Sequence, residues 1–259
     1  MSHEPLPLGE PDVWPTRLTK LLDEHREVFL NWEVAPDRVG APFWDTAIMA
    51  VAEALSRYSI TGWHCTRLTD AEIGQIIASG KQLPDGAMLR RRIEALVLAN
   101  LLPGDVAGRL QTVNQADDSN RAGMLWFCFF PPRLAGEHGI GRFFRYWGGE
   151  ALYNLHEDDA ATSQLLRAIG TPCLVEADVP VSALKSAVGL AIKLVRRDLI
   201  RRGDSTEEPS EHEDRCIQPL AATCIRRVIR GGDPEFATLT GGHAWLRPPD
   251  TVQRGMAAD

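Results

Sequence analysis

Apolar side chains recur three and four residues apart in the segments 16–32 and 43–58. In the first segment they are Leu18, Leu21, Leu22, Val28 and Phe29, and in the second they are Phe43, Ile48, Val51, Ala52 and Leu55. Residues with this spacing lie on one face of a helix. The pattern predicts two packed helices, separated by a break at 36–42 and preceded by a flexible, proline-rich and acidic lead at 1–14.

The rest of the chain mixes helical patterns with short apolar segments. Further helical patterns cover 69–80, 86–113 with a break at Pro103-Gly104, 149–155 and 180–200. Strand patterns cover 60–66, 124–130, 172–179, 215–220 and 223–230. Polar or glycine-rich runs, expected to be loops, cover 114–123, 136–149 and 203–214. Thr69 offers an N-cap and Gly80 a C-terminal glycine for the helix between them.

This order of helices and strands predicts an α+β fold. We expect an N-terminal helical region at 1–59, a main domain at 60–240 and an irregular tail at 241–259. The 259 residues, of which 44% are hydrophobic, are enough to bury a sizeable core without disulfides.

Charge and cysteine content limit the functional classes. A net charge of −7 disfavours a protein that holds nucleic acid by general attraction to phosphates. The five cysteines form no CxxC pair and read as reduced thiols. The N-terminus has no secretory pattern and no apolar run reaches the ~18 residues of a membrane span, so we expect a cytoplasmic protein without a membrane partner.

Three short motifs carry candidate chemistry. The first is WHCTR, in which His64, Cys65, Thr66 and Arg67 follow a tryptophan. The second is MLWFC with Trp126, followed after a loop by GGEALY with Tyr153. The third is EDRCI, which Glu213 opens at the start of a late strand. In this order the motifs resemble those of the ADP-ribosyltransferase superfamily, in its poly(ADP-ribose) polymerase-like branch with a histidine, an aromatic residue and a glutamate.

The resemblance covers roughly residues 60–230 and implies a fold and a set of roles. The fold would be a split β-sheet core that binds NAD+ as co-substrate, without a metal. His64, Cys65, Thr66 and Arg67 would bind NAD+ on the first strand, together with Trp126 and Tyr153, of which Tyr153 would stack on the nicotinamide. Glu213 and His64 would be the catalytic residues, and Arg67 or Arg145 would reach the pyrophosphate.

The residue types suit that chemistry. Cleavage of the bond between nicotinamide and ribose develops positive charge on the ribose, which a nearby carboxylate stabilises. A histidine can form a hydrogen bond with a ribose hydroxyl. Glu211 is close to Glu213 in the sequence and is a second candidate for the carboxylate.

Two positions depart from the family pattern. Trp126 stands where the family has a tyrosine, and Glu150 stands where it has a serine that holds the nicotinamide amide. Three functions therefore stay open: transfer of ADP-ribose to an acceptor, hydrolysis of NAD+ by water, and a noncatalytic interaction module. The resemblance also suggests a toxin or antiviral defence effector with an antitoxin or regulatory partner, and the acceptor can be protein, nucleic acid or a small molecule.

Overall fold

The computed structural model describes residues 4–34, 40–205 and 213–249, and it has an α+β architecture around one six-stranded sheet. The strands follow the order β5-β3-β2-β4-β6, and β1 pairs with β2 outside this path. The strands are β1 (Glu4–Leu6), β2 (Tyr58–Leu68), β3 (Leu125–Cys128), β4 (Thr171–Pro180), β5 (Glu213–Cys216) and β6 (Ile225–Arg230). The β1–β2 pair is parallel and the others are antiparallel.

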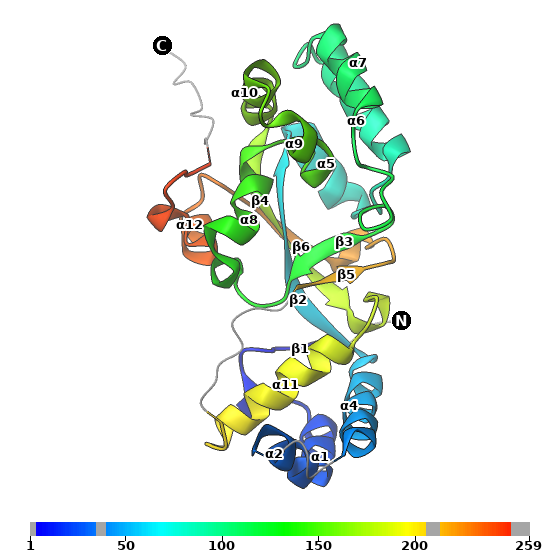
Figure 1. The fold of residues 1–259 in the computed structure, drawn as a ribbon, viewed down its shortest axis with the longest axis vertical. Coiled ribbons are helices and arrows are strands. Elements are labelled where there is room, and N and C mark those ends of the chain that lie inside the picture. The colour runs from blue at the N-terminus through cyan, green and yellow to red at the C-terminus, as the bar shows by residue number, and fades with distance from the viewer. Residues whose placement is uncertain (1–3, 35–39, 206–212, 250–259) are drawn as a thin grey trace.

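The long strand β2 is the axis of the molecule (Figure 1). It pairs with β4 from Ser59–Pro180 to Leu68–Thr171, so the strands predicted at 60–66 and 172–179 are confirmed and extended at both ends. Gly62 allows a close approach at the middle of β2, because a Cβ atom there would lie 2.7 Å from the ring of Phe129.

Helices gather at both ends of β2 and over one face (Figure 1). At one end lie α1 (Thr16–Glu24), α2 (Arg26–Val34), α4 (Ala41–Leu55) and α11 (Val188–Arg201). At the other end lie α5 (Asp70–Ser79), α6 (Gly86–Leu98), α7 (Gly104–Thr112), α9 (Glu150–His156) and α10 (Ala160–Ala168). The remaining helices are α8 (Gly136–Arg145) and α12 (Pro234–Thr240), whose Phe144 and Phe236 pack with Cys65 of β2.

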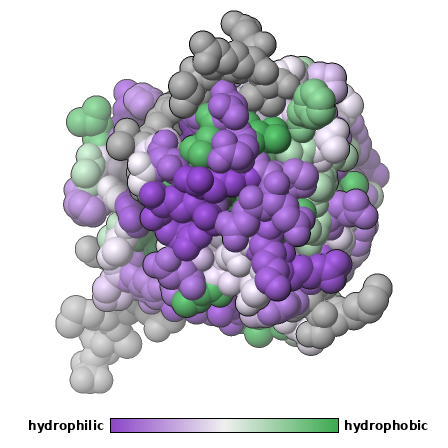
Figure 2. Space-filling view, turned by 90° about the horizontal axis from the view of Figure 1, so that it is seen from below, coloured by the Kyte–Doolittle hydropathy of each residue, from purple (hydrophilic) through white to green (hydrophobic). Residues whose placement is uncertain are grey.

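The N-terminal helices share one core with elements from the rest of the chain. A single cluster of buried residues joins Leu18 of α1 and Val51 of α4 to Phe127 of β3 and Leu194 of α11. The outer surface of this end is mostly hydrophilic (Figure 2), which agrees with helices whose apolar faces point inward. Residues 1–59 therefore have no separate core among the described residues.

The expectation of a flexible lead is wrong for the described part of residues 1–14. Leu6 and Trp14 are buried, and β1 adds a strand beside β2. Leu6 and Leu8 both enter the core, so a short proline-rich segment is fixed by apolar anchors and by backbone pairing.

Three predictions of helices and loops need correction, and one further helix was not predicted. The segment 136–149, expected to be a loop, contains α8, because the buried Ile140 and Phe144 give it an apolar stripe that outweighs its glycines. The helix expected at 180–200 begins only at Val188, after Pro180 and a short 3-10 helix. The segment 16–32 is divided at His25, and α10 was not predicted.

The start and end of α5 follow the prediction from sequence. The hydroxyl of Thr69 accepts a hydrogen bond from the backbone of Glu72, and the Glu72 carboxylate accepts one from the backbone of Thr69. Gly80 ends the helix with φ +79°, and a Cβ atom there would lie 2.0 Å from the carbonyl oxygen of Leu220. This close approach lets Lys81 form an antiparallel bridge with Leu220.

Candidate functional site

The sheet opens between β2 and β3 at His64. In the described part of the chain the pairing of these strands consists of Trp63 with Cys128. At the next residue of β2 the imidazole Nδ1 of His64, and not a backbone amide, donates to the carbonyl oxygen of Trp126 at 2.8 Å. β5 continues the sheet on the far side of β3, with Glu213 opposite Cys128. The strands that carry His64, Trp126 and Glu213 are thus successive neighbours.

The hydrogen bond at Nδ1 fixes the tautomer of His64. A carbonyl oxygen can only accept, so Nδ1 carries the proton and Nε2 of a neutral ring presents a lone pair. Burial, and then the positive charge of Lys81, hold the pKa of His64 well below its usual value. His64 is therefore a neutral hydrogen-bond acceptor at pH 7, and its ring lies 5.8 Å from that of Phe127.

Cys65 lies on the opposite face of β2 from His64, because side chains alternate along a strand. Its thiol forms a hydrogen bond with Cys128, and this bond, together with burial, raises its pKa well above the usual value. The charge of Glu213 adds to this shift. Glu213 pairs with Cys128, which pairs with Trp63, so its side chain lies on the Cys65 face. The structure thus places His64 and Glu213 on the two sides of the opening and does not bring them into one side-chain cluster.

The two arginines expected at a pyrophosphate are part of the scaffold. Arg67 is 1% exposed, and its Nε and Nη1 donate to the carbonyl oxygens of Ile169 at 2.7 Å and Phe144 at 3.0 Å. Arg145 donates to the carbonyl oxygen of Arg247 and is paired with Glu137. The expectation that either reaches a phosphate does not fit these contacts.

Thr66, the remaining residue of the first motif, is partly exposed. Thr66 follows Cys65 on β2, is only partly buried, and pairs across the sheet with Cys173 of β4. Because side chains alternate, Thr66 lies on the same face as His64, toward α5. Its hydroxyl is the second polar group on this side of the opening.

The two motif aromatics differ in exposure. Tyr153 is 2% exposed, and the guanidinium of Arg142 covers its ring at 4.1 Å. Arg142 is itself paired with Glu157. Trp126 is 39% exposed, with Arg215 at 5.2 Å from its ring. Trp126 is therefore more accessible to a ligand than Tyr153, whose expected stacking role would need Arg142 to move.

Glu150 and the candidate carboxylates have distinct surroundings. Glu150 lies 3.4 Å from the guanidinium of Arg121, and with burial it raises the pKa of the Tyr153 phenol. Glu213 is exposed at the start of β5. Glu211 lies outside the described residues, so the structure offers Glu213 alone for comparison with the sequence motif.

A cavity of about 560 Å³ lies between α5 and α6. Lys81 lines this cavity. The sequence motifs did not include it, and the only local signal is its position directly after Gly80, which ends α5. Burial, and then the nearby Arg92, lower the pKa of Lys81 to about 8. The charge of Lys81 also lowers the pKa of His64, so this wall of the cavity is within electrostatic range of that residue.

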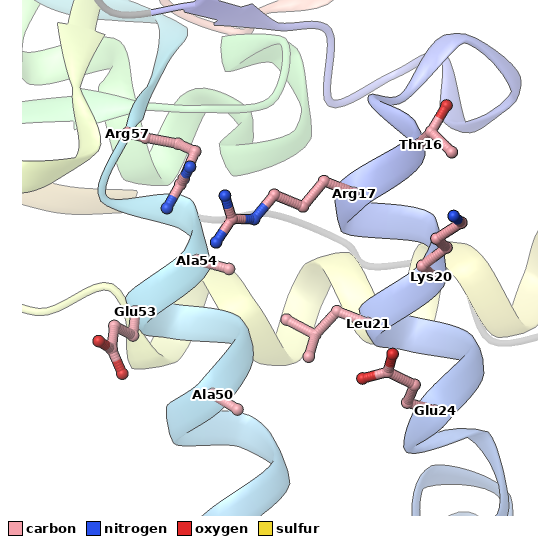
Figure 3. A pocket seen from close by; sticks show the side chains of 9 residues that line it. All are labelled: Thr16, Arg17, Lys20, Leu21, Glu24, Ala50, Glu53, Ala54 and Arg57. Carbon is pink, nitrogen blue, oxygen red and sulfur yellow. The ribbon is translucent and has the colours of Figure 1, made fainter.

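A groove of about 660 Å³ lies at the far end of the molecule, between α1 and α4. In Figure 3 the side chains of Arg17 and Arg57 extend toward each other across it, and Leu21 and Ala54 lie beneath them. No residue of the three motifs lines this groove.

Comparison of the chain with known protein families, curated proteins and solved structures finds no match. Among the described residues, no group of three or more histidines, cysteines or acidic residues is arranged to hold a metal ion. None of the described helices combines the length and apolar character required to cross a membrane.

Proposed function

We propose that this chain is an ADP-ribosyltransferase that transfers ADP-ribose from NAD+ to an acceptor. The observation that carries the proposal is the opening between β2 and β3, where the strands bearing His64, Trp126 and Glu213 lie next to one another. Nε2 of His64 can accept a hydrogen bond on one face of the sheet, and the accessible ring of Trp126 and the carboxylate of Glu213 lie on the other face. These are the groups that the chemistry requires.

In the proposed reaction the bond between nicotinamide and the ribose C1′ breaks, and its electron pair leaves with nicotinamide. A new bond forms between C1′ and the acceptor oxygen or nitrogen, with inversion, and the proton of the acceptor passes to a base or to solvent. The carboxylate of Glu213 would stabilise the positive charge on the ribose and polarise the acceptor. The lone pair on Nε2 of His64 would accept a hydrogen bond from a ribose hydroxyl.

The exposure of the two rings changes the roles that we propose for Trp126 and Tyr153. Trp126 presents accessible surface at the opening and would line the nicotinamide pocket. Tyr153 lies under Arg142 and would support the wall of the pocket. The backbone of Cys65 and the hydroxyl of Thr66 would contribute polar contacts to NAD+, in a site that uses no metal.

The test is to incubate the protein and its Glu213→Gln variant with NAD+ labelled in the adenylate part, with and without cell lysate. We expect Glu213→Gln to retain the fold and to lower nicotinamide release about 100-fold, as for loss of a group that stabilises developing charge. Asp214→Asn is the matched control, because the neighbouring side chain points to the other face of β5. Nicotinamide release by Glu213→Gln at the wild-type rate would remove Glu213 from its role.

The same assay separates the rival functions. Label attached to an acceptor supports transfer, and its loss to protease or nuclease identifies the acceptor class. Free ADP-ribose without labelled acceptor indicates an NAD+ glycohydrolase. Absence of both products and of NAD+ binding would favour a noncatalytic interaction module. A defence or toxin role would need growth arrest in cells that depends on Glu213.

A further inference from the structure

Lys81 is a partly buried positive charge, which Glu72 offsets only in part and from a distance. Its backbone is fixed by the bridge to Leu220, with N···O distances of 2.8 Å and 2.9 Å. Among the residues that the structure describes, no side chain forms a hydrogen bond or ion pair with its ammonium group. A partly buried ammonium without a partner is costly, and burial accordingly lowers its pKa.

The carboxylates that line the same cavity are already engaged. Glu72 accepts from Nε of Arg92 at 2.6 Å and from the indole Nε1 of Trp147 at 3.1 Å, in addition to capping α5. Asp70 is paired with Arg230 at 2.5 Å. Neither carboxylate forms an ion pair with Lys81, and the cavity therefore keeps an excess of positive charge.

A second basic residue adds to this excess. Arg91 lines the cavity from α6, is exposed, and has no hydrogen-bond or ion-pair partner among the described residues. The rest of the wall is largely apolar and includes Ile76, Met88 and Leu96. A volume of about 560 Å³ is within the range of sites that hold small ligands. Charge at one part of the wall and apolar surface elsewhere suit a nucleotide.

We infer that Lys81 and Arg91 form an anion site for the diphosphate of NAD+. The inference rests on the proposed function, and it supplies the phosphate contacts that Arg67 and Arg145 cannot make while they bind the scaffold. The diphosphate of NAD+ would occupy the α5–α6 cavity, on the face of β2 that carries His64 and Thr66. The ammonium group would bind phosphate oxygens as a point charge, and the guanidinium would add a bidentate contact.

The first test measures binding of inorganic pyrophosphate by isothermal titration calorimetry. We expect Lys81→Met to weaken pyrophosphate binding at least about 10-fold, while Lys81→Arg retains most of it. Lys20→Met, at an exposed position on α1, is the control and should bind pyrophosphate as the wild type does. We expect Lys81→Met to fold, because the substitution removes a partly buried charge that has no ion-pair partner among the described residues and keeps the length of the side chain.

The second test measures NAD+ turnover by the same variants. In an active enzyme Lys81→Met should raise the KM for NAD+ more than it lowers kcat. Pyrophosphate binding that depends on Lys81 in a protein without NAD+ turnover would refute the proposed function and leave the anion site in place. NAD+ turnover with an unchanged KM in Lys81→Met would refute the anion site and leave the proposed function in place. Absence of pyrophosphate binding by the wild type would also refute the anion site.

Discussion

His64 shows how one side chain can open a sheet. Its Nδ1–H bonds to the Trp126 carbonyl at the position where a backbone amide of β2 would continue the ladder with β3. The strands therefore diverge without leaving this carbonyl unpaired. The same bond leaves the lone pair of Nε2 directed away from the Trp126 carbonyl.

The low pKa of His64 predicts a pH-dependent stability. Burial and the charge of Lys81 keep the folded-state pKa well below the unfolded value near 6.5. As pH falls below about 6.5, the unfolded chain binds a proton that the folded chain resists, so stability is lost on acidification. His64→Gln should remove about 1 kcal/mol of the stability difference between roughly pH 7.5 and 5.5, measured by urea unfolding at both values.

The control for this prediction is an exposed histidine. His138→Gln on α8 should leave the pH dependence of the unfolding free energy as in the wild type. The same decrease on acidification in His64→Gln and in the wild type would show that His64 does not resist protonation in the folded protein.

The motifs of the sequence lie on strands that prove to be neighbours, and the roles of their residues stay predictions. His64, Trp126 and Glu213 are carried by β2, β3 and β5, which are successive strands of the sheet. The sequence could not show that Arg67 is buried between the ends of α8 and α10, since that depends on packing of three distant segments. It also missed Lys81 as a residue of the α5–α6 cavity, because only the folded chain shows which residues line that cavity.

At the scale of elements, capping residues, proline–glycine breaks and apolar periodicity predicted the helices and strands that depend on local sequence. The N-cap and the C-terminal glycine of α5, the break between α6 and α7 and the central strands β2 and β4 were all predicted. The helix α8 was not, because its glycines favour a loop locally and only packing of Ile140 and Phe144 against the sheet makes the helix stable.

Glu72 joins three elements, and we predict a large effect of its removal. Its carboxylate caps α5 at Thr69, pairs with Arg92 of α6 and accepts the indole hydrogen bond of the buried Trp147. Although burial opposes ionisation, the charge of Arg92 and these hydrogen bonds give a lowered pKa. Glu72→Ala leaves several donors without an acceptor, and it should lower the free energy of unfolding by about 2–3 kcal/mol.

The measurement is urea unfolding at pH 7, followed by far-UV circular dichroism. Glu94→Ala is the matched control on α6, because Glu94 is exposed, and a change within about 0.5 kcal/mol is expected there. An equally small change in Glu72→Ala would mean that water or alternative partners replace the carboxylate.

At the scale of the whole molecule, the late helix α11 completes the core that the first helices begin. Asp198 of α11 is 4% exposed and accepts hydrogen bonds from Arg201 and Arg202, and Arg202 also pairs with Asp23 of α1. Periodicity in the sequence predicted apolar faces on these helices but could not identify their partners. The expected division at residue 59 follows chain order, whereas the packing joins both sides of that boundary.

This shared core predicts that substitutions far apart in the sequence affect the same unfolding transition. Leu18 on α1 and Leu194 on α11 are each 1% exposed in one cluster. Leu18→Ala and Leu194→Ala should each lower the free energy of unfolding by about 2–4 kcal/mol, because each leaves a cavity in that core. Tryptophan fluorescence during urea unfolding reports the change through the buried Trp14 and Trp44 of the same cluster.

The decisive comparison is whether both variants shift one common phase. Ile77→Ala on α5 is the control, since this side chain is 56% exposed and lies outside the cluster. If residues 1–59 formed an independent unit, unfolding would show two phases, with Leu18→Ala shifting one and Leu194→Ala the other.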